Sequence, residues 1–134
     1  MIVVDTSAWV ELFRGTESPA HLALERLVRA RAELMVTEVV VMELLAGTQD
    51  ASATREVRRR LAAVPVLPMK GLADYETAAA LYRACRRGGE TVRSLTDCLI
   101  VVAVIAAGAT LLGADRDFEV LARHTPLRLE PLAA

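Results

Sequence analysis

The chain has few of the residues that mark secreted or disulfide-bonded proteins. Only two cysteines occur among its 134 residues, Cys85 and Cys98, and each falls inside a helical pattern. No basic region precedes the apolar start, and an acid already stands at position 5, so we expect no signal peptide. These absences predict a cytoplasmic protein whose cysteines are small core residues in a reducing compartment.

A long uninterrupted apolar run is also missing. The most hydrophobic segment, from Cys98 to Ala114, carries no charge, but a transmembrane helix needs about 20 consecutive apolar residues. Gly108, Thr110 and Gly113 interrupt this segment, which favours a buried helix followed by a buried strand. We therefore expect no membrane association.

Charge of one sign is not in excess either. The 16 basic and 17 acidic residues leave a formal net charge of −1, which argues against a protein that coats nucleic acid by charge alone. Lys70 is the only lysine, so nearly all basic residues are arginines, which form two-pronged bonds to phosphate. With 134 residues and no low-complexity tract, the sequence predicts one domain over 1–134 with a proper hydrophobic core.

Apolar periodicity divides the chain into alternating strands and helices. The expected strands are 2–4, 34–36, 64–67, 109–112 and 126–129. The expected helices are 7–13, 21–31, 38–46, 51–63, 70–87, 96–107 and 117–123. Pro65 and Pro68 place the third strand at an edge, because proline cannot donate to a strand ladder. This alternation indicates an α/β fold around a mostly parallel sheet.

Several aspartates stand beside these predicted elements, and each has a plain structural explanation. Asp5 follows a strand and precedes a helix, which is the place of an N-cap. Asp97 lies three residues after Ser94, a capping-box-like spacing, and Asp115 and Asp117 precede Phe118 in the last helix. Taken singly, each aspartate is better explained as a helix cap than as a catalyst.

Glu43 is different because its helical neighbours are apolar or small. The residues three and four positions away are Val39, Val40, Ala46 and Gly47. A glutamate on that face is expected to turn inward, where a carboxylate needs a cation or hydrogen-bond donors. For Glu43 alone, an ion pair with an arginine and a functional site are equally open.

Taken together, the acids are expected to lie at one edge of the sheet. Ligands of parallel α/β sheets bind beyond the carboxyl ends of the strands, where Asp5 and Asp115 both stand. From Asp97 the helix to Ala107 travels about 15 Å. The strand that follows returns roughly 16 Å. The equal lengths predict that Asp97 and Asp115 share one edge of the sheet.

A carboxylate cluster of this kind calls for a cation, because like charges otherwise raise one another's pKa. His21 and His124 are the only histidines and lie away from the acids, and the cysteines are not spaced for zinc. An all-oxygen site selects hard divalent cations, Mg²⁺ or Mn²⁺. Asp97 is thus interpreted as a metal ligand at the rim of a helix whose body fills the core.

Four segments in order resemble one known family over essentially the whole chain. They read IVVDTSAWVELF, TEVVVMELLAG, RSLTDCLIVVAV and LLGADRDFEVLA. Together they resemble the PIN-domain ribonucleases, and more narrowly the VapC toxins of bacterial toxin–antitoxin pairs. The resemblance implies a three-layer α/β/α sandwich with a central, mostly parallel sheet of about five strands.

The resemblance also implies roles for individual residues. By motif, Asp5, Glu43 and Asp97 match the core metal-binding acids, Asp115 the fourth catalytic acid and Asp117 an assisting ligand. Thr6 and Thr96 match polar positions that either position metal waters or phosphate, or cap helices. Arg93, near the acids, is a candidate contact for a substrate phosphate, whereas Arg86 and Arg87 are explained by the end of a helix.

The implied activity is Mg²⁺- or Mn²⁺-dependent cleavage of RNA phosphodiesters, neutralised by a VapB-like antitoxin, in a protein expected to be a homodimer. Two alternatives stand beside it. A signalling domain of the receiver type, or a phosphatase of the haloacid-dehalogenase type, would also bind Mg²⁺ at strand ends. A second acid two residues after Asp5 is missing, however, since Ser7 stands there, and a late lysine is missing too. A non-catalytic binding module with the same fold is the other alternative.

Overall fold

The predicted alternation of strands and helices is present in the computed structural model, which describes residues 1–132. The strands are β1 (Ile2–Val4), β2 (Leu34–Thr37), β3 (Val66–Leu67) and β4 (Thr110–Leu112). The helices are α1 (Thr6–Arg14), α2 (Pro19–Arg29), α3 (Glu38–Ala46), α4 (Ala51–Leu61), α5 (Leu72–Arg87), α6 (Leu95–Ala106) and α7 (Arg116–His124). The last two residues of the predicted domain over 1–134 lie outside the described residues.

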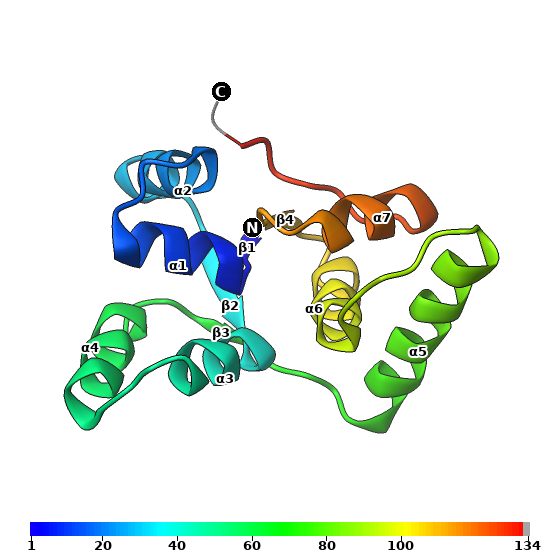
Figure 1. Ribbon diagram of the computed structural model, residues 1–134, viewed down its shortest axis with the longest axis horizontal. Coiled ribbons are helices and arrows are strands. Elements are labelled where there is room, and N and C mark those ends of the chain that lie inside the picture. The colour runs from blue at the N-terminus through cyan, green and yellow to red at the C-terminus, as the bar shows by residue number, and fades with distance from the viewer. Residues whose placement is uncertain (133–134) are drawn as a thin grey trace.

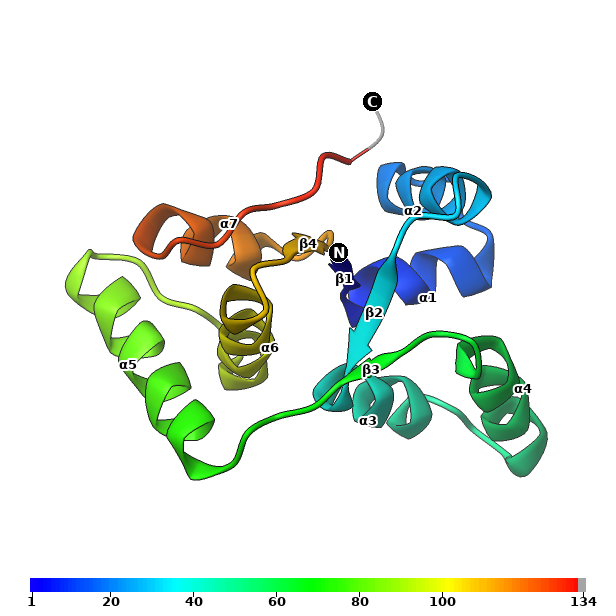
Figure 2. The same cartoon turned by 180° about the vertical axis from the view of Figure 1, so that it is seen from behind.

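All four strands pair in parallel, in the order β3-β2-β1-β4. Ile2 in β1 is opposite Leu34 in β2 and Thr110 in β4, so β1 lies in the middle of the sheet. Figures 1 and 2 show α1, α2 and α4 on one side of the strands and α5, α6 and α7 on the other. The α/β fold with helices flanking a parallel sheet is thereby confirmed.

The fifth predicted strand, 126–129, is reduced to a single bridge. Leu129 pairs in parallel with Leu111. The Leu111 N–H donates to the Arg128 carbonyl at 3.0 Å, and the Glu130 N–H donates to the Leu111 carbonyl at 2.8 Å. The Thr110 hydroxyl adds a side-chain bond to Oε2 of Glu130 at 3.0 Å, but the backbone bonds of this segment to β4 are those at Leu111.

Proline explains two shifted boundaries. β3 covers 66–67 instead of 64–67, because Pro65 contributes only its carbonyl, which accepts from the Val36 N–H at 3.0 Å. Its edge position is as predicted. α2 begins at Pro19, before the predicted start at His21, with the Ser18 hydroxyl accepting from the His21 N–H at 3.3 Å. Proline is well suited to a first helical position, so it starts this helix instead of delaying it.

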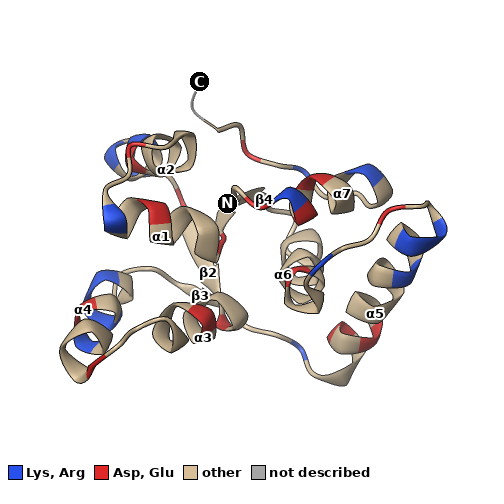
Figure 3. Ribbon diagram, viewed as in Figure 1, with Lys and Arg blue, Asp and Glu red and all other residues tan. Residues whose placement is uncertain are grey.

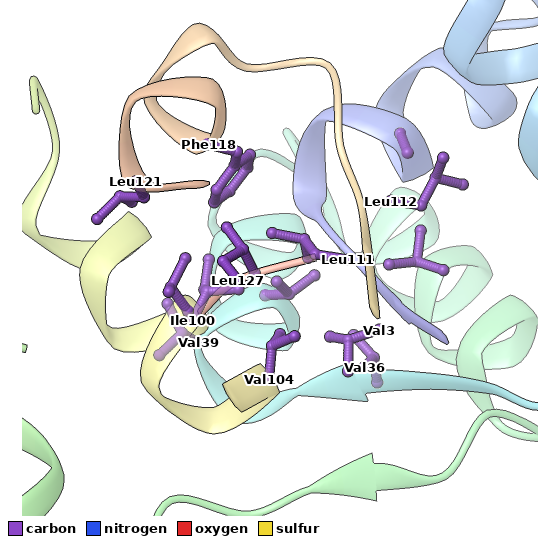
Figure 4. Close-up of a cluster of buried hydrophobic side chains, with 14 of the residues drawn as sticks. Val3, Val36, Val39, Ile100, Val104, Leu111, Leu112, Phe118, Leu121 and Leu127 are labelled. Carbon is purple, nitrogen blue, oxygen red and sulfur yellow. The ribbon is translucent and has the colours of Figure 1, made fainter. Parts of the chain in front are cut away.

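The uncharged segment after Asp97 forms the centre of the core. In α6, Ile100, Val101 and Val104 are fully buried. Figure 4 shows Ile100 and Val104 in one cluster with side chains of β1, β4 and α7. The start of α3 is set by Thr37, whose hydroxyl accepts from the Val40 N–H at 3.1 Å.

Within residues 1–132, no helix has the length and apolar character that crossing a bilayer requires.

Removing packing from α6 should therefore destabilise the whole fold. We expect Ile100→Ala to lower the free energy of unfolding by about 2–5 kcal/mol, through lost apolar burial and the cavity left behind. Leu72→Ala, at a side chain that is 74% exposed, should change it by less than about 0.5 kcal/mol. Urea unfolding of both variants measures the difference, and equal effects would contradict a core centred on α6.

Candidate metal-binding site

The carboxyl ends of β1 and β4 meet beside Asp5. The Asp5 N–H donates to the Leu112 carbonyl at 2.8 Å, which joins the two strand ends directly. Gly113 follows β4, and a Cβ added there would lie 2.9 Å from Cδ2 of Phe118 and 3.2 Å from Cβ of Asp5. Because glycine leaves this space open, the segment leading to Asp115 passes close to Asp5.

Asp5 is the N-cap of α1 and also lies at this edge of the sheet. Its Oδ2 accepts from the Ser7 backbone N–H at 3.0 Å and from the Ser7 hydroxyl at 2.7 Å. The Ser7 hydroxyl also accepts from the Ala114 N–H at 2.9 Å, so one serine ties the end of β1 to the segment after β4. Sequence reasoning missed this role of Ser7, whose only signal was a hydroxyl two residues after a capping aspartate.

Asp97, Asp115 and Asp117 come together at the same edge. One carboxylate oxygen from each lies within 4.8 Å of the others. The prediction from helix and strand lengths that Asp97 returns to Asp115 is therefore confirmed. Figure 3 shows acidic positions on α6 and at the start of α7, with further acidic positions on α3.

Asp97 does not serve as a cap. It is 6% exposed, and among the described residues its buried Oδ2 has no hydrogen-bond partner. Burial raises the pKa of Asp97 to about 8, together with a hydrogen bond to Asp117 and repulsion from Asp5, Asp115 and Asp117. A buried, unpartnered carboxylate oxygen among other carboxylates is a position that favours either a proton or a cation.

Asp115 and Asp117 are held in different ways. Asp115 caps α7, its Oδ1 accepting from the Asp117 N–H at 2.9 Å. Asp117 is 2% exposed and accepts from the Arg93 N–H at 3.1 Å on Oδ1 and 3.0 Å on Oδ2, and from the Ser94 N–H at 3.0 Å on Oδ2. Burial alone would raise the pKa of Asp117, but bonds from Arg93, Asp97 and Ser94 outweigh it and lower this pKa.

Glu43 approaches the edge from α3, where its partner is a hydroxyl group and not an arginine. Its Oε1 accepts from the Thr6 hydroxyl at 3.0 Å, and within residues 1–132 it has no ion pair with an arginine. Burial raises the pKa of Glu43, as does repulsion from Asp5 and Asp115, whereas the Thr6 bond lowers it. Glu43 and Asp5 lie outside the tight group of three but within range of its charge.

The three polar residues predicted to contact substrate all lie at this site. Thr6 orients Glu43 and is not the cap of α1, which is Asp5. The Thr96 hydroxyl lies 2.7 Å from the Ser94 hydroxyl at the start of α6. Arg93 is 66% exposed, with its Nη2 3.5 Å from Oδ1 of Asp115 and its Nε 3.6 Å from Oδ1 of Asp117.

The acidic edge is separate from the large apolar groove of this protein. That groove has a volume of about 660 Å³ and lies between α1, α2 and the segment before β3. Trp9, Leu12 and Phe13 line it, with Arg31 and Arg60 among its polar residues, and none of the predicted site residues does. The fold and the site together define an α/β protein with a carboxylate-lined site at the ends of its central parallel strands.

Comparison with known proteins agrees with this class. Residues 2–124 match the PIN domain family. The chain is 43% identical over 129 residues to ribonuclease VapC11 of Mycobacterium tuberculosis and to VapC ribonuclease Mb1587 of Mycobacterium bovis, covering 96% of this chain and 96% of each relative. The chain therefore belongs to the PIN-domain family and, within it, to the VapC ribonucleases.

Solved structures share the fold. VapBC2 from Rickettsia felis, bound to a DNA fragment of its promoter, aligns with a TM-score of 0.75 at 20% identity, over 97% of this chain and 98% of that one. VapC20 of Mycobacterium tuberculosis, a toxin that cleaves the sarcin–ricin loop, aligns with a TM-score of 0.65 at 21% identity, over 96% and 99%. At these identities the likeness establishes the fold.

The raised pKa of Asp97 gives metal-free protein a pH-dependent stability. The folded chain keeps a proton on Asp97 up to about pH 8, whereas the unfolded chain releases it near 3.8. The resulting stabilisation is complete below the lower value and is lost as pH rises through the higher one. In EDTA we expect the free energy of unfolding to fall between about pH 5 and 8.

Asp97→Asn should reduce this fall and make the metal-free protein more stable than wild type at about pH 8, because the amide stays neutral. Raised pKa values at Asp5 and Glu43 have the same sign, so part of the fall should persist. Urea unfolding across pH measures both proteins. Parallel curves for wild type and variant would show that Asp97 does not carry the effect.

Proposed function

We propose that this protein is a metal-dependent endoribonuclease that hydrolyses RNA phosphodiester bonds at the acidic edge. We propose further that it is the toxin of a toxin–antitoxin pair. The observation that carries the proposal is the unpartnered, buried Oδ2 of Asp97 within a group of carboxylates. Membership of the VapC ribonucleases supports the choice of RNA as substrate.

The residues of the edge fit a hard divalent cation. Every side chain of the group offers oxygen, and three carboxylate oxygens lie within 4.8 Å of one another. Such a donor set matches Mg²⁺ or Mn²⁺ and not a metal that prefers sulfur or imidazole. When bound, the ion would supply the positive charge that activates water for in-line attack and stabilises the leaving oxygen.

The chain's own residues have separate tasks in this proposal. Asp5, Glu43, Asp97 and Asp115 are the catalytic acids that hold the ion. Ser7 fixes the orientation of Asp5 through two hydrogen bonds, and Thr6 fixes that of Glu43 through one. Because both hydroxyls lock acids that the sheet has already brought together, the ligand set is arranged before the ion arrives.

Asp117 is the fifth predicted ligand and has a second task. A carboxylate has about four lone-pair positions, so the N–H bonds from Arg93 and Ser94 leave room for one more contact. Those N–H bonds hold the start of the α6 segment beside the acids. Arg93, exposed above them, is the proposed contact for a substrate phosphate, and Thr96 lies beside it at the same helix start.

The partner of this protein is proposed to be a VapB-like antitoxin. Related structures include VapBC complexes from Rickettsia felis and Salmonella typhimurium. The apolar groove beside α1 offers an antitoxin an area to bury, with Arg31, Glu33 and Arg60 in its lining available for ion pairs. A homodimer and a cytoplasmic location, where RNA is found, stay predictions.

Cleavage should require both the metal and Asp97. We expect wild type to cleave RNA with Mg²⁺ or Mn²⁺ and to stop in excess EDTA, and Asp97→Asn to lose at least about 100-fold of activity. Glu76→Gln removes an acid from the exposed face of α5 and should retain activity. The assay uses a panel of tRNA and rRNA fragments, with Mn²⁺ affinity measured in parallel by calorimetry.

Two outcomes would contradict the proposal. Cleavage that survives in EDTA or in folded Asp97→Asn would mean that the acidic edge is not the catalytic site. Tight Mn²⁺ binding with no cleavage of any RNA in the panel would favour the alternative of a non-catalytic metal-binding domain.

A further inference from the structure

The connection between α5 and α6 is held at both of its ends by α7. This connection, residues 88–94, carries Arg93 and leads into the helix that presents Asp97. At its far end Asp117 accepts the Arg93 and Ser94 N–H groups, as described above. In its middle, Val92 is 2% exposed and anchored in the core.

The near end of the connection is held by Glu90. The Arg123 Nε donates to Glu90 Oε1 at 3.0 Å, and a second Arg123 nitrogen contacts Oε2, which makes the pair two-pronged. The His124 Nε2 lies 3.1 Å from the same Oε1. Arg123 and then His124 lower the pKa of Glu90 to about 2, so this residue is ionised at any working pH.

Gly88 completes the contact by making room for the histidine ring. A Cβ added at Gly88 would collide with the His124 imidazole, 2.9 Å from its Nδ1. Gly88 and Glu90 therefore meet the same turn of α7, Gly88 by close packing and Glu90 by charge. A planar two-pronged pair fixes direction as well as distance, which a single exposed ion pair does not.

These contacts are partly exposed, and ion pairs of this kind contribute little to stability, so we assign them a geometric role. α7 has Asp115 as its N-cap, Asp117 in its first turn and Arg123 in its last, and it contacts the 88–94 connection at both ends. Holding the connection against α7 sets the position of Arg93 relative to Asp115 and Asp117, where its guanidinium lies 3.5 and 3.6 Å away.

We propose that Glu90, gripped by Arg123 and His124, is a positioning residue that holds the 88–94 connection so that Arg93 faces the phosphate-binding side of the acidic edge. This inference rests on the proposed function for the meaning of Arg93, but not for the clamp itself. It assigns to Glu90, 33 residues before Arg123 in the sequence, an effect on RNA binding without contact with RNA.

Glu90→Gln tests the clamp, because glutamine keeps the shape and removes the charge. Glu25→Gln is a matched control, since Glu25 also pairs with one arginine and one histidine, Arg29 at 2.6 Å and His21 at 3.5 Å, but on α2. In metal-free protein we expect amide hydrogen exchange at Arg93 and Ser94 to speed up about fivefold in Glu90→Gln only.

Gly88→Ala should have the same effect on exchange by displacing His124, while keeping the Glu90 charge. Unchanged exchange at Arg93 and Ser94 in both folded variants would overturn the clamp, whatever the activity of the protein.

Steady-state kinetics test whether Glu90 affects RNA binding by positioning Arg93. On an RNA that wild type cleaves, Glu90→Gln should raise KM about fivefold and leave kcat within about twofold. Added to Arg93→Ala, it should raise KM no further, because the contact it positions is already gone. If Glu90→Gln raised KM equally in wild type and in Arg93→Ala, Glu90 would not act through Arg93, and the proposal would be overturned.

The two proposals fail in different ways. A wild type that cleaves no RNA speaks against the proposed function, and the exchange measurement still decides the clamp. An Arg93→Ala variant with a wild-type KM removes Arg93 as a phosphate contact. A raised KM in Arg93→Ala with normal KM and normal exchange in Glu90→Gln overturns the further inference alone.

Discussion

Repulsion among carboxylates is the constraint that the rest of this structure must satisfy. Parallel pairing of β1 with β4 brings Asp5 and the segment carrying Asp115 to one edge, and α6 brings Asp97 to the same place. Like charges this close cannot all ionise at low cost, and this repulsion adds to burial, the larger cause, in raising the pKa of Asp97 to about 8. The metal-free fold thus carries an electrostatic cost that a bound cation would relieve.

The apolar core keeps the acids together in spite of their mutual repulsion. Ile100 and Val104 bury the body of α6 against the sheet, so Asp97 cannot move away from the other acids without disturbing that packing. Hydroxyl groups then direct the acids individually, Ser7 for Asp5 and Thr6 for Glu43. Apolar packing sets where the acids are, and local hydrogen bonds set how they point.

α7 links the acidic edge to the 88–94 connection. Its N-cap Asp115 and the Asp117 of its first turn lie at the acidic edge, and its last turn binds the connection before α6 through Arg123 and His124. A short helix with functional contacts at both ends acts as a rigid spacer between the acids and Arg93. In the proposed mechanism, the geometry of the site therefore depends on residues that touch neither metal nor RNA.

Local rules along the chain were enough to predict much of this protein. Period and capping predicted the bounds of α3, proline predicted the edge position of β3, and chain lengths predicted that Asp97 meets Asp115. Only the tertiary structure decided that Asp117 binds backbone N–H groups 24 and 23 residues before it, or that one serine joins segments 107 residues apart. Every residue except proline has a backbone N–H, so residue type does not predict which N–H a distant carboxylate will bind. It exists only because packed helices bring the two segments together.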